Sequence, residues 1–396
     1  MFRISGLKVL SSGRRVAVTT SFFGNLGFHR DALLSFKFFS VLPSNASFGS
    51  LKDECIHSFT VSYLVNSCGM PLQTALDVAS KVKFKTPKNP DIVLSLLRTQ
   101  GFTKSQISKI VKQFPRLLFF NSDRTLLPKF EFLHSIGLSK SDCVQIVYSC
   151  PFLLGSSVKN HLLPCYNYLK SVLVVDEKVI KCLKRSPRAF RQVFPDKIAP
   201  NIELLRTSGV SDVLISSLVS NVPDSAFRRH SKFRSIVNQV RDMGFDPSKV
   251  VFVEAIRVLS GMSSLTWERK FKAYSKYGWS KDQTLLAFKK FPPCLSVSEE
   301  KIFKNMDFFV HKMGLMAVDI ATKPTVMVFS LEKRIIPRCS VVQSLYSKGL
   351  LKKKLSIASI LHPTEKTFLE KYVTKFPNDA TWLLHLYTGE VKIFDV

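Results

Sequence analysis

The sequence predicts an all-α protein, a curved and right-to-left stacked α-solenoid of about seven helical repeats of roughly 35 residues each. The first observation is a series of four prolines spaced 36 residues apart, namely Pro115, Pro151, Pro187 and Pro223. Three of them are followed 13 residues later by a second proline, at Pro128, Pro164 and Pro200. Glycines keep nearly the same period, with Leu173 in the one missing place: Gly101, Gly137, Gly209, Gly244, Gly278, Gly314 and Gly349. Apolar residues at helical spacing, the third observation, recur in each copy.

The segment from Gly101 to Gly137 illustrates one repeat. Thr103 is the predicted N-cap of a first helix, because its hydroxyl can accept a hydrogen bond from the first turn. Pro115 ends that helix, since proline has no N–H and its ring clashes with the preceding turn. A short connection follows, a second helix starts around Ser122 to Pro128, and Gly137 ends it in a left-handed conformation.

The first helix of each copy is expected to bury one apolar face. That face consists of Ile107, Ile110, Val111 and Phe114, then Cys143, Ile146, Val147 and Cys150, then Val179, Cys182 and Leu183, then Ile215, Leu218, Val219 and Val222. Later copies are less regular. Asp246 and Pro247 are expected as N-cap and first-turn proline of a helix in which Ser260 replaces the terminal proline, and Ser280 is expected to cap the next helix.

The charge of the chain indicates a polyanionic partner. It contains 58 Lys+Arg against 29 Asp+Glu, a formal net charge of +29. A charge of this size on a folded chain is typical of nucleic-acid binding. A membrane surface is the competing partner, but basic membrane binders concentrate their charge beside one apolar segment, whereas here it is spread over every repeat. No apolar run reaches the ~18 residues of a membrane span.

The N-terminal segment differs in kind from the repeats. Its first 40 residues hold six basic residues and a single acid, Asp31. An Arg/Ser-bearing, acid-poor leader without a compact apolar stretch resembles an organellar transit peptide, the alternative being a flexible basic arm. We therefore expect a transit peptide over 1–43, a helical lead-in over 44–87, the repeats over 88–385 and a C-terminal tail over 386–396. The predicted compartment is the mitochondrion, with the chloroplast as the alternative.

No catalytic or metal-binding pattern is present in the sequence. The eight histidines are scattered without an HExxH motif, and no P-loop or GxGxxG occurs. The eight cysteines form no CxxC pair, so buried free thiols are expected rather than a zinc site. We predict that the protein is not an enzyme and that it needs no cofactor or metal. Phe120, Trp267 and Trp279 could stack on bases, but core positions are favoured for all three.

Candidate nucleic-acid-binding residues recur in two registers of the repeat. One lies just before the first proline: Lys112, Lys184, Arg185, Lys289 and Lys290. The other surrounds the start of the second helix: Arg124, Lys129, Lys159, Arg191, Arg228, Arg229, Lys232, Arg234, Lys301, Lys304, Lys333, Arg334 and Arg338. Arg188 lies beside Pro187 in the densest basic segment. Any one of these could be a solvated surface charge, but their recurrence in register favours a phosphate-binding track.

The punctuation of the repeat resembles the mitochondrial transcription termination factor (mTERF) family, and within it the plant organellar branch. The residues that carry the resemblance are Phe114–Leu118 with Leu126–Lys129, Cys150–Leu154 with Leu162–Pro164, and Lys323–Pro324 with Ile335–Arg338. It covers roughly residues 55 to 385. The replacements at Ser260 and Leu173, and a shortened unit between Gly314 and Pro324, depart from the pattern.

The resemblance implies a superhelix with a basic inner track that binds double-stranded DNA, and in some members RNA. It also implies regulation of organellar transcription, such as termination, by a protein expected to be a monomer. An RNA-binding factor for intron splicing or RNA processing is the first alternative. A scaffold that docks on an acidic protein is the second, and weak salt dependence of binding would favour it.

Overall fold

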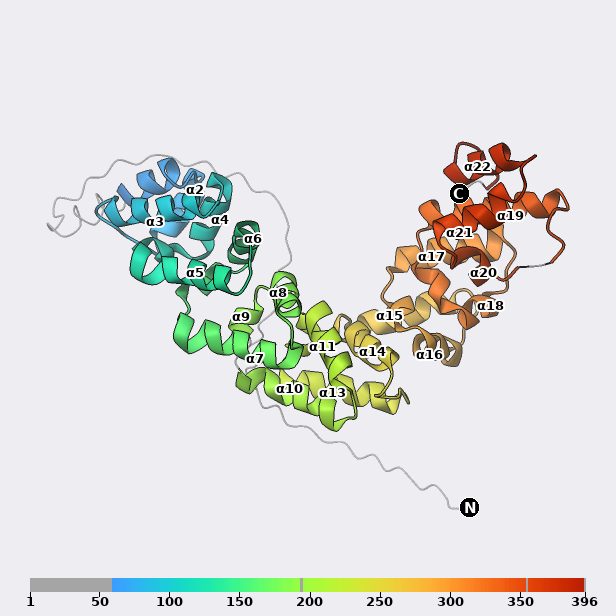
Figure 1. Ribbon diagram of the computed structural model, residues 1–396, viewed down its shortest axis with the longest axis horizontal. Coiled ribbons are helices and arrows are strands. Elements are labelled where there is room, and N and C mark those ends of the chain that lie inside the picture. The colour runs from blue at the N-terminus through green and yellow to red at the C-terminus, as the bar shows by residue number, and fades with distance from the viewer. Residues whose placement is uncertain (1–58, 193–194, 354, 395–396) are drawn as a thin grey trace, which may run out of the picture. The chain divides into compact units, whose positions relative to one another are not determined.

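The computed structural model describes residues 59–192, 195–353 and 355–394, and every regular element among them is a helix (Figure 1). These residues belong to one compact unit, Asp53–Val396. The predicted transit peptide over 1–43 lies outside the described residues, as do the start of the lead-in and the side chains of 191–197. The all-α prediction is confirmed for the part of the chain that the structure describes.

Most helices form pairs of a first and a second helix. The first helices are α4 (Lys104–Gln113), α6 (Lys140–Ser149), α8 (Asp176–Arg185), α11 (Asp212–Asn221), α14 (Val250–Ser260), α16 (Lys281–Lys290), α18 (Ala317–Thr322) and α20 (Ile357–Leu361). Their second helices are α5 (Leu127–Ser135), α7 (Leu163–Leu173), α10 (Pro195–Thr207), α13 (His230–Asp242), α15 (Ser264–Ser275), α17 (Glu299–Asp307) with η6 (Phe308–Lys312), α19 (Ile336–Ser347), and α21 (Glu365–Leu369) with η9 (Glu370–Thr374). A helical segment at 59–66, α2 (Leu72–Ala79) and α3 (Lys88–Thr99) precede these pairs, and α22 (Ala380–Thr388) follows them.

Short helical turns connect the two helices of most pairs. Five of them begin at the first proline of the repeat: η1 (Pro115–Phe119), η3 (Pro151–Gly155), α12 (Pro223–Ala226), η5 (Pro292–Leu295) and η7 (Pro324–Val328). The turn after Pro187 contains α9 (Ala189–Gln192). In η1, Leu117 and Leu118 are fully buried. We call these segments the proline turns.

The helix starts follow the predicted capping chemistry. The Thr103 hydroxyl accepts a hydrogen bond from the Gln106 backbone N–H, and the Gln106 side chain accepts one from the Thr103 N–H. Ser280 and Gln283 form the same reciprocal capping box at the start of α16. Each box satisfies two N–H groups that the helix itself leaves unpaired. Both predicted N-caps are confirmed.

A widened helical turn, which the sequence did not predict, comes just before the second proline of the repeat. Before Pro128, Pro164 and Pro337 the chain forms single π-helical turns: η2 (Ser122–Leu126), η4 (Val158–Leu162) and η8 (Leu331–Ile335). In η2 the Leu126 N–H donates to the Asn121 carbonyl, five residues back, at 3.2 Å. A proline ring clashes with the carbonyl four residues before it. The wider turn places that carbonyl where the ring is tolerated.

The glycines of the repeat end α3 and most of the second helices with positive φ, as expected, from 63° at Gly314 to 98° at Gly101. The missing glycine is replaced one residue later than predicted, because Leu173 is a buried helical residue and Val174 forms the turn. Val174 has φ 69° and ψ −49°, and the Val175 N–H donates to the Leu173 carbonyl at 2.9 Å. This is a γ-turn centred on a β-branched residue, a strained conformation.

The unit after Gly244 departs from the prediction at both ends of its first helix. Helix α14 begins at Val250 with Lys249 as N-cap, whereas the Asp246 carboxylate accepts from the Ser248 N–H at 2.9 Å in a preceding turn. The predicted N-cap role of Asp246 is therefore wrong. At the other end no proline turn forms, since α15 starts after only three residues at an angle of 109° to α14.

The core is a continuous stack of the predicted apolar faces. Successive first helices α4, α6, α8, α11, α14, α16 and α18 contact one another in that order. The faces predicted from the sequence are buried almost completely, with Ile110, Ile146 and Cys182 at 0% exposure. Each pair therefore packs on its neighbours in sequence, and the stacked solenoid is confirmed.

Asparagine side chains join three helices, α3, α10 and α17, to the proline turn that follows each of them. The Asn89 amide donates to the Leu118 and Phe120 carbonyls at 2.7 and 3.3 Å. Asn201 donates to the Ala226 and Arg228 carbonyls, both at 2.8 Å. Asn305 of α17 makes the same two bonds in η7, to Met327 and Phe329. Carbonyls left without helical partners where a proline ends a helix are satisfied in this way.

Among the described residues, no single helix has the length and apolar composition of a membrane span. The bent pair of α14 and α15 meets those two criteria only when its helices are taken together.

Replacing Val174 by glycine should stabilise the protein. Glycine adopts a positive φ without strain, and relief of about 1–3 kcal/mol outweighs its entropic cost of about 0.5–1 kcal/mol. The expected gain of about 1 kcal/mol is measured by urea unfolding. The mirror control is Gly137→Val, which imposes a side chain at φ 95° with its Cβ only 3.1 Å from Ile180 Cδ1 and should destabilise. If Val174→Gly and wild type had the same free energy of unfolding, the backbone at Val174 would not be strained.

Asn201→Ala should destabilise the stack. It leaves two buried carbonyls without donors, so a loss of about 2–3 kcal/mol is expected in the same unfolding measurement. Asn66 is exposed and bonds only to Ser62, so Asn66→Ala should change stability by less than about 0.5 kcal/mol. Similar effects of the two substitutions would refute a structural role for Asn201.

Candidate nucleic-acid interface

The predicted binding residues lie at one end of each helical pair, where the chain turns from the first helix to the second. We call this region the proline edge: the last turn of the first helix, the proline turn and the first turns of the second helix. Neighbouring proline edges are joined directly. Arg185 Nη1 donates to the Asn221 carbonyl at 2.6 Å, and the Ser186 hydroxyl donates to Asp224 at 2.6 Å. The proline edge therefore continues from one pair to the next.

Eight of the predicted cations are exposed on the proline edge. Their side chains form no hydrogen bond or ion pair with any described residue, so their charge is open to solvent. They are Lys112, Arg124, Lys159, Arg188, Arg229, Lys232, Lys290 and Lys333. Arg124, Lys159 and Lys333 occupy the π turns, where Arg124 and Lys333 are each the third residue and Lys159 is the second.

Three other predicted cations at the surface have internal partners, and a fourth is half-buried. Lys184 forms an ion pair with Asp142 of α6, with 2.5 Å between Nζ and Oδ1. The hydrogen bond from Lys184 holds the pKa of the Asp142 carboxyl below its usual value. Arg234 lies 2.8 Å from the His230 ring. Arg185 bonds to α11 as described above, and Lys289 is half-buried with its Nζ near Gly244.

Two of the predicted contacts are corrected by the structure, because Lys129 and Arg338 are only 5% and 1% exposed. Lys129 donates to the Thr125 carbonyl, and burial lowers the pKa of its ammonium. Arg338 donates to the Pro363 and Leu361 carbonyls at 2.6 and 3.2 Å. Its guanidinium lies 4.7 Å from the centre of the Phe368 ring. Neither side chain has surface to offer a phosphate.

Three further cations of the second register also serve the backbone. Arg334 donates to the Leu361 and Pro363 carbonyls at 2.8 Å each, and Arg228 donates to the Ser260 carbonyl. Lys301 donates to the Val328 carbonyl at 2.6 Å. Each of these side chains extends from the second helix, or from the turn just before it, to the following helical pair. There it donates to backbone carbonyls, as the asparagines do in other pairs. Their ordinary role is therefore in packing between repeats.

The remaining predicted residues complete this picture. Lys304 pairs with Glu300 within α17 at 2.8 Å. Arg191 belongs to α9, and its side chain lies outside what the structure describes.

The helical repeat can be compared with those of known proteins. The chain matches the mTERF family over residues 94–258 and 250–369, which together make up more than half of the sequence. The chain belongs to the mTERF family. It is also 24% identical over 306 residues to "Transcription termination factor MTERF15, mitochondrial" from Arabidopsis thaliana, covering 77% of this chain and 60% of that relative. The predicted family and its plant branch are thus supported by a plant relative of greater length.

Within this mTERF protein, the sequence analysis missed the residues that satisfy the turn carbonyls. These are Asn89, Asn201 and Asn305, together with Lys270, which donates to the Val297 carbonyl. The sequence does contain a pattern that indicates these internal bonds. The residue directly after the second proline is Lys129, Cys165, Asn201 or Arg338 in successive complete motifs, and all four are buried. A polar residue at this position of the repeat marks an internal bond rather than an external contact.

The aromatic and cysteine predictions agree with the structure. Trp279 is 2% exposed, stacks on Tyr274 and donates its indole N–H to the Ala317 carbonyl at 2.8 Å. Phe120 and Trp267 pack against the core. All seven described cysteines are buried and none forms a disulfide with another described cysteine, and burial raises the pKa of the Cys339 thiol to about 12. The described residues hold no cluster of His, Cys, Asp or Glu that could bind a metal ion.

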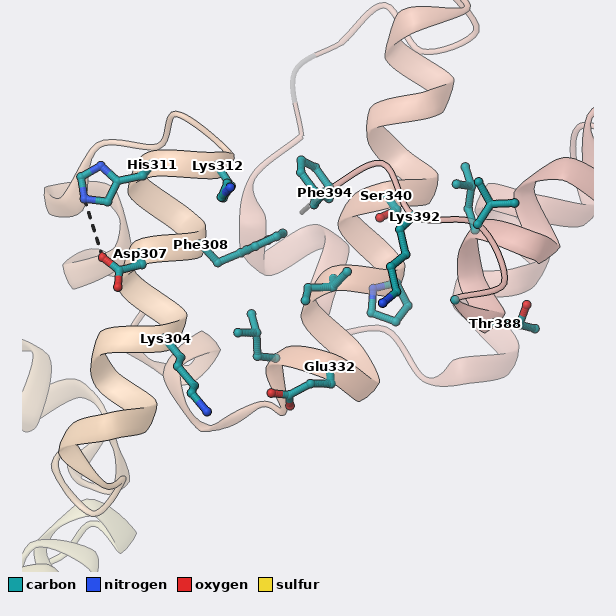
Figure 2. Close-up of a pocket in the computed structure, with 16 residues that line it drawn as sticks. Lys304, Asp307, Phe308, His311, Lys312, Glu332, Ser340, Thr388, Lys392 and Phe394 are labelled. Carbon is teal, nitrogen blue, oxygen red and sulfur yellow. Dashed lines mark ion pairs between the residues drawn. The ribbon is translucent and has the colours of Figure 1, made fainter. Parts of the chain in front are cut away.

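A cavity of about 680 Å³ lies near the C-terminus of the mTERF repeats, lined by α17, η6, η8, α19 and the segment after α22. Figure 2 shows Lys304, Asp307 and His311 on one side and Glu332, Lys392 and Phe394 on the other. The Phe394 ring packs on Phe308 at 5.1 Å, so the C-terminal segment helps to wall the cavity. The only ion pair among these lining residues is Asp307–His311 at 3.7 Å. This arrangement has no set of groups that converge on one point.

Arg338→Ala and Lys333→Ala should have different effects on stability, because Arg338 is buried and bonded within the fold whereas Lys333 is exposed. Arg338→Ala removes a buried side chain and leaves the Pro363 carbonyl without its donor, so the free energy of unfolding should fall by about 2–4 kcal/mol. Lys333 is exposed and unpaired, so Lys333→Ala should change stability by less than about 0.5 kcal/mol. Thermal and urea unfolding measure both. A stable Arg338→Ala variant would show that this arginine is free to act elsewhere.

Proposed function

We propose that this mTERF protein binds nucleic acid along its proline edge and regulates gene expression in an organelle. The observation that carries the proposal is the set of exposed, unpaired cations at the proline edges, from Lys112 in α4 to Lys333 in η8. A stable fold does not need these charges, because none has an internal partner. Phosphates spaced along a nucleic-acid backbone are their natural counterions.

Double-stranded DNA is the ligand we favour. Proteins that bind single strands commonly stack the unpaired bases on exposed aromatic rings or arginine side chains. The half-exposed rings on the proline turns, Phe119 and Phe152, lie four residues after one proline and one residue after the next. They therefore cannot form a regular stacking series. Lysine and arginine contacts without such rings suit a duplex backbone.

Transcription termination in the mitochondrion is the process and compartment we favour. The Arabidopsis relative carries both in its name, and the basic, acid-poor residues 1–43 have the composition of a transit peptide. Binding without catalysis is proposed, since regulation of this kind requires only occupancy of the template.

Arg229→Ala/Lys232→Ala should weaken nucleic-acid binding. Each lost phosphate contact removes about 0.9 from the slope of log affinity against log salt, so the slope should fall by about 1–2. Fluorescence anisotropy with a labelled DNA duplex at several salt concentrations measures it. Lys352→Ala/Lys353→Ala is the matched control, because these exposed lysines lie away from the proline turns. Equal effects of the two double variants would show that net charge, not the proline edge, governs binding.

Crosslinking in isolated organelles tests the proposal as a whole. The protein is crosslinked in mitochondria and in chloroplasts, and both bound DNA and bound RNA are sequenced. Enrichment of mitochondrial DNA is the expected result. Recovery of RNA would replace the ligand with RNA, and recovery of neither would overturn nucleic-acid binding in favour of a protein partner.

A further inference from the structure

Helix α13 has a surface unlike that of a simple phosphate-binding helix. It buries Phe233, Ile236, Val237 and Val240 and exposes the rest of its length. Its outer face is rich in groups that both donate and accept hydrogen bonds: Ser231, Ser235, Asn238 and Gln239. A groove follows this face, formed by the four residues with Arg234, Asp242 and Met243 of the same segment and by Leu285 of α16.

Folding does not explain these polar side chains. Ser231, Ser235, Asn238 and Gln239 form no side-chain hydrogen bond with any described residue. Serine and asparagine are also poorer helix formers than alanine, lysine or glutamate. Serine, asparagine and glutamine side chains can also contact phosphates, but Arg229, Lys232 and Arg241 are exposed beside them for that purpose. Amide groups are instead suited to base edges, where asparagine or glutamine pairs with adenine through one donor and one acceptor.

Arg234 on the same face is held in place by a chain of hydrogen bonds from the core. Its Nη2 lies 2.8 Å from His230 Nε2. A guanidinium only donates, so Nε2 accepts and the ring hydrogen is on Nδ1. Nδ1 therefore donates to the Asn201 Oδ1 at 2.8 Å, and Asn201 is fully buried and bonded to the turn carbonyls.

This chain of bonds leaves most donors of Arg234 available. The Nε, the Nη1 group and the second hydrogen of Nη2 make no bond within the described residues. A side chain already fixed in position loses less entropy when it binds. Arginine with two free parallel donors is the usual partner of guanine in the major groove. Arg234 and Asn238 are one helical turn apart, about 6 Å, which is close to two base-pair steps.

Charge surrounds the groove on the helix itself. Arg229, Lys232 and Arg241 are exposed, and Asp242 is the only acid in α13. At the far end, Lys289 Nζ of α16 lies 3.5 Å from the position that a Cβ on Gly244 would occupy. Basic groups at both ends with amides between them match a nucleic acid, which presents phosphates on either side of its base edges.

We propose that the outer face of α13 reads the base edges of double-stranded DNA, with Arg234, Asn238 and Gln239 as the residues that determine sequence preference. Arg229, Lys232 and Arg241 hold the flanking phosphates. The proposal rests on the nucleic-acid binding proposed above and adds where the sequence is read. It assigns guanine to Arg234 and adenine to the two amides.

The test is selection of preferred sequences by the full chain from a library of random DNA duplexes. Wild type should select a motif with guanine and adenine about two base pairs apart. Asn238→Ala/Gln239→Ala should lose the adenine preference, by about 5- to 150-fold at that position, with unchanged affinity for non-specific duplex. Arg234→Ala should lose the guanine preference in the same way. Alanine favours the helix, and circular dichroism confirms that each variant is folded.

Two control variants distinguish recognition of the base sequence from electrostatic binding to the phosphates. Lys232→Ala should lower affinity for every sequence alike and leave the motif intact. Gln145→Ala replaces an exposed amide on α6 and should alter neither affinity nor motif. A motif that survives Asn238→Ala/Gln239→Ala, or a wild type that binds duplexes without preference, would overturn this inference alone. A wild type that binds no nucleic acid would overturn the proposed function together with it.

Discussion

Backbone carbonyls left without helical partners at the proline turns are the main constraint on how the helical pairs of this protein stack. A proline ends the first helix by removing an N–H donor, and the carbonyls of the following turn are buried between two helical pairs. At three of these turns an asparagine of the preceding helix reaches across and donates to two of the carbonyls. Asn89, Asn201 and Asn305 do so with one amide each. Each of these helices is thereby fixed to the following pair at one end.

The same constraint divides the basic residues into two populations. Arg338, Lys301 and Arg334 are drawn inward, because a cation can donate to turn carbonyls when no asparagine is present or when further carbonyls remain. Cations one or two positions away, such as Lys333, point outward from the same turn. The high net charge therefore does not mean that every basic residue is available to bind a phosphate. Only the outward population can contribute to binding and to its salt dependence.

Helix α13 shows how internal and external roles connect. Asn201 satisfies the turn carbonyls and also accepts from His230, which in turn accepts from Arg234. The bond that holds two repeats together thus also orients a surface arginine. In the unit that follows, α14 and α15 meet without a proline turn, and Arg228 supplies the donor for the Ser260 carbonyl. The irregular copy keeps its contact with the stack by a different side chain.

The periodic features of the fold follow from the sequence alone. Helix starts at Thr103 and Ser280, helix ends at proline and glycine, and the buried faces follow from local chemistry that each copy repeats. The family followed from the same punctuation. Which cations face solvent depends on the tertiary packing. Arg338 is buried against a carbonyl of the next helical pair, and Lys129 is buried although its own bond to the Thr125 carbonyl is local. The tertiary packing also decided that Val174, not Leu173, replaces the missing glycine, since packing of Leu173 in the core moves the turn by one residue.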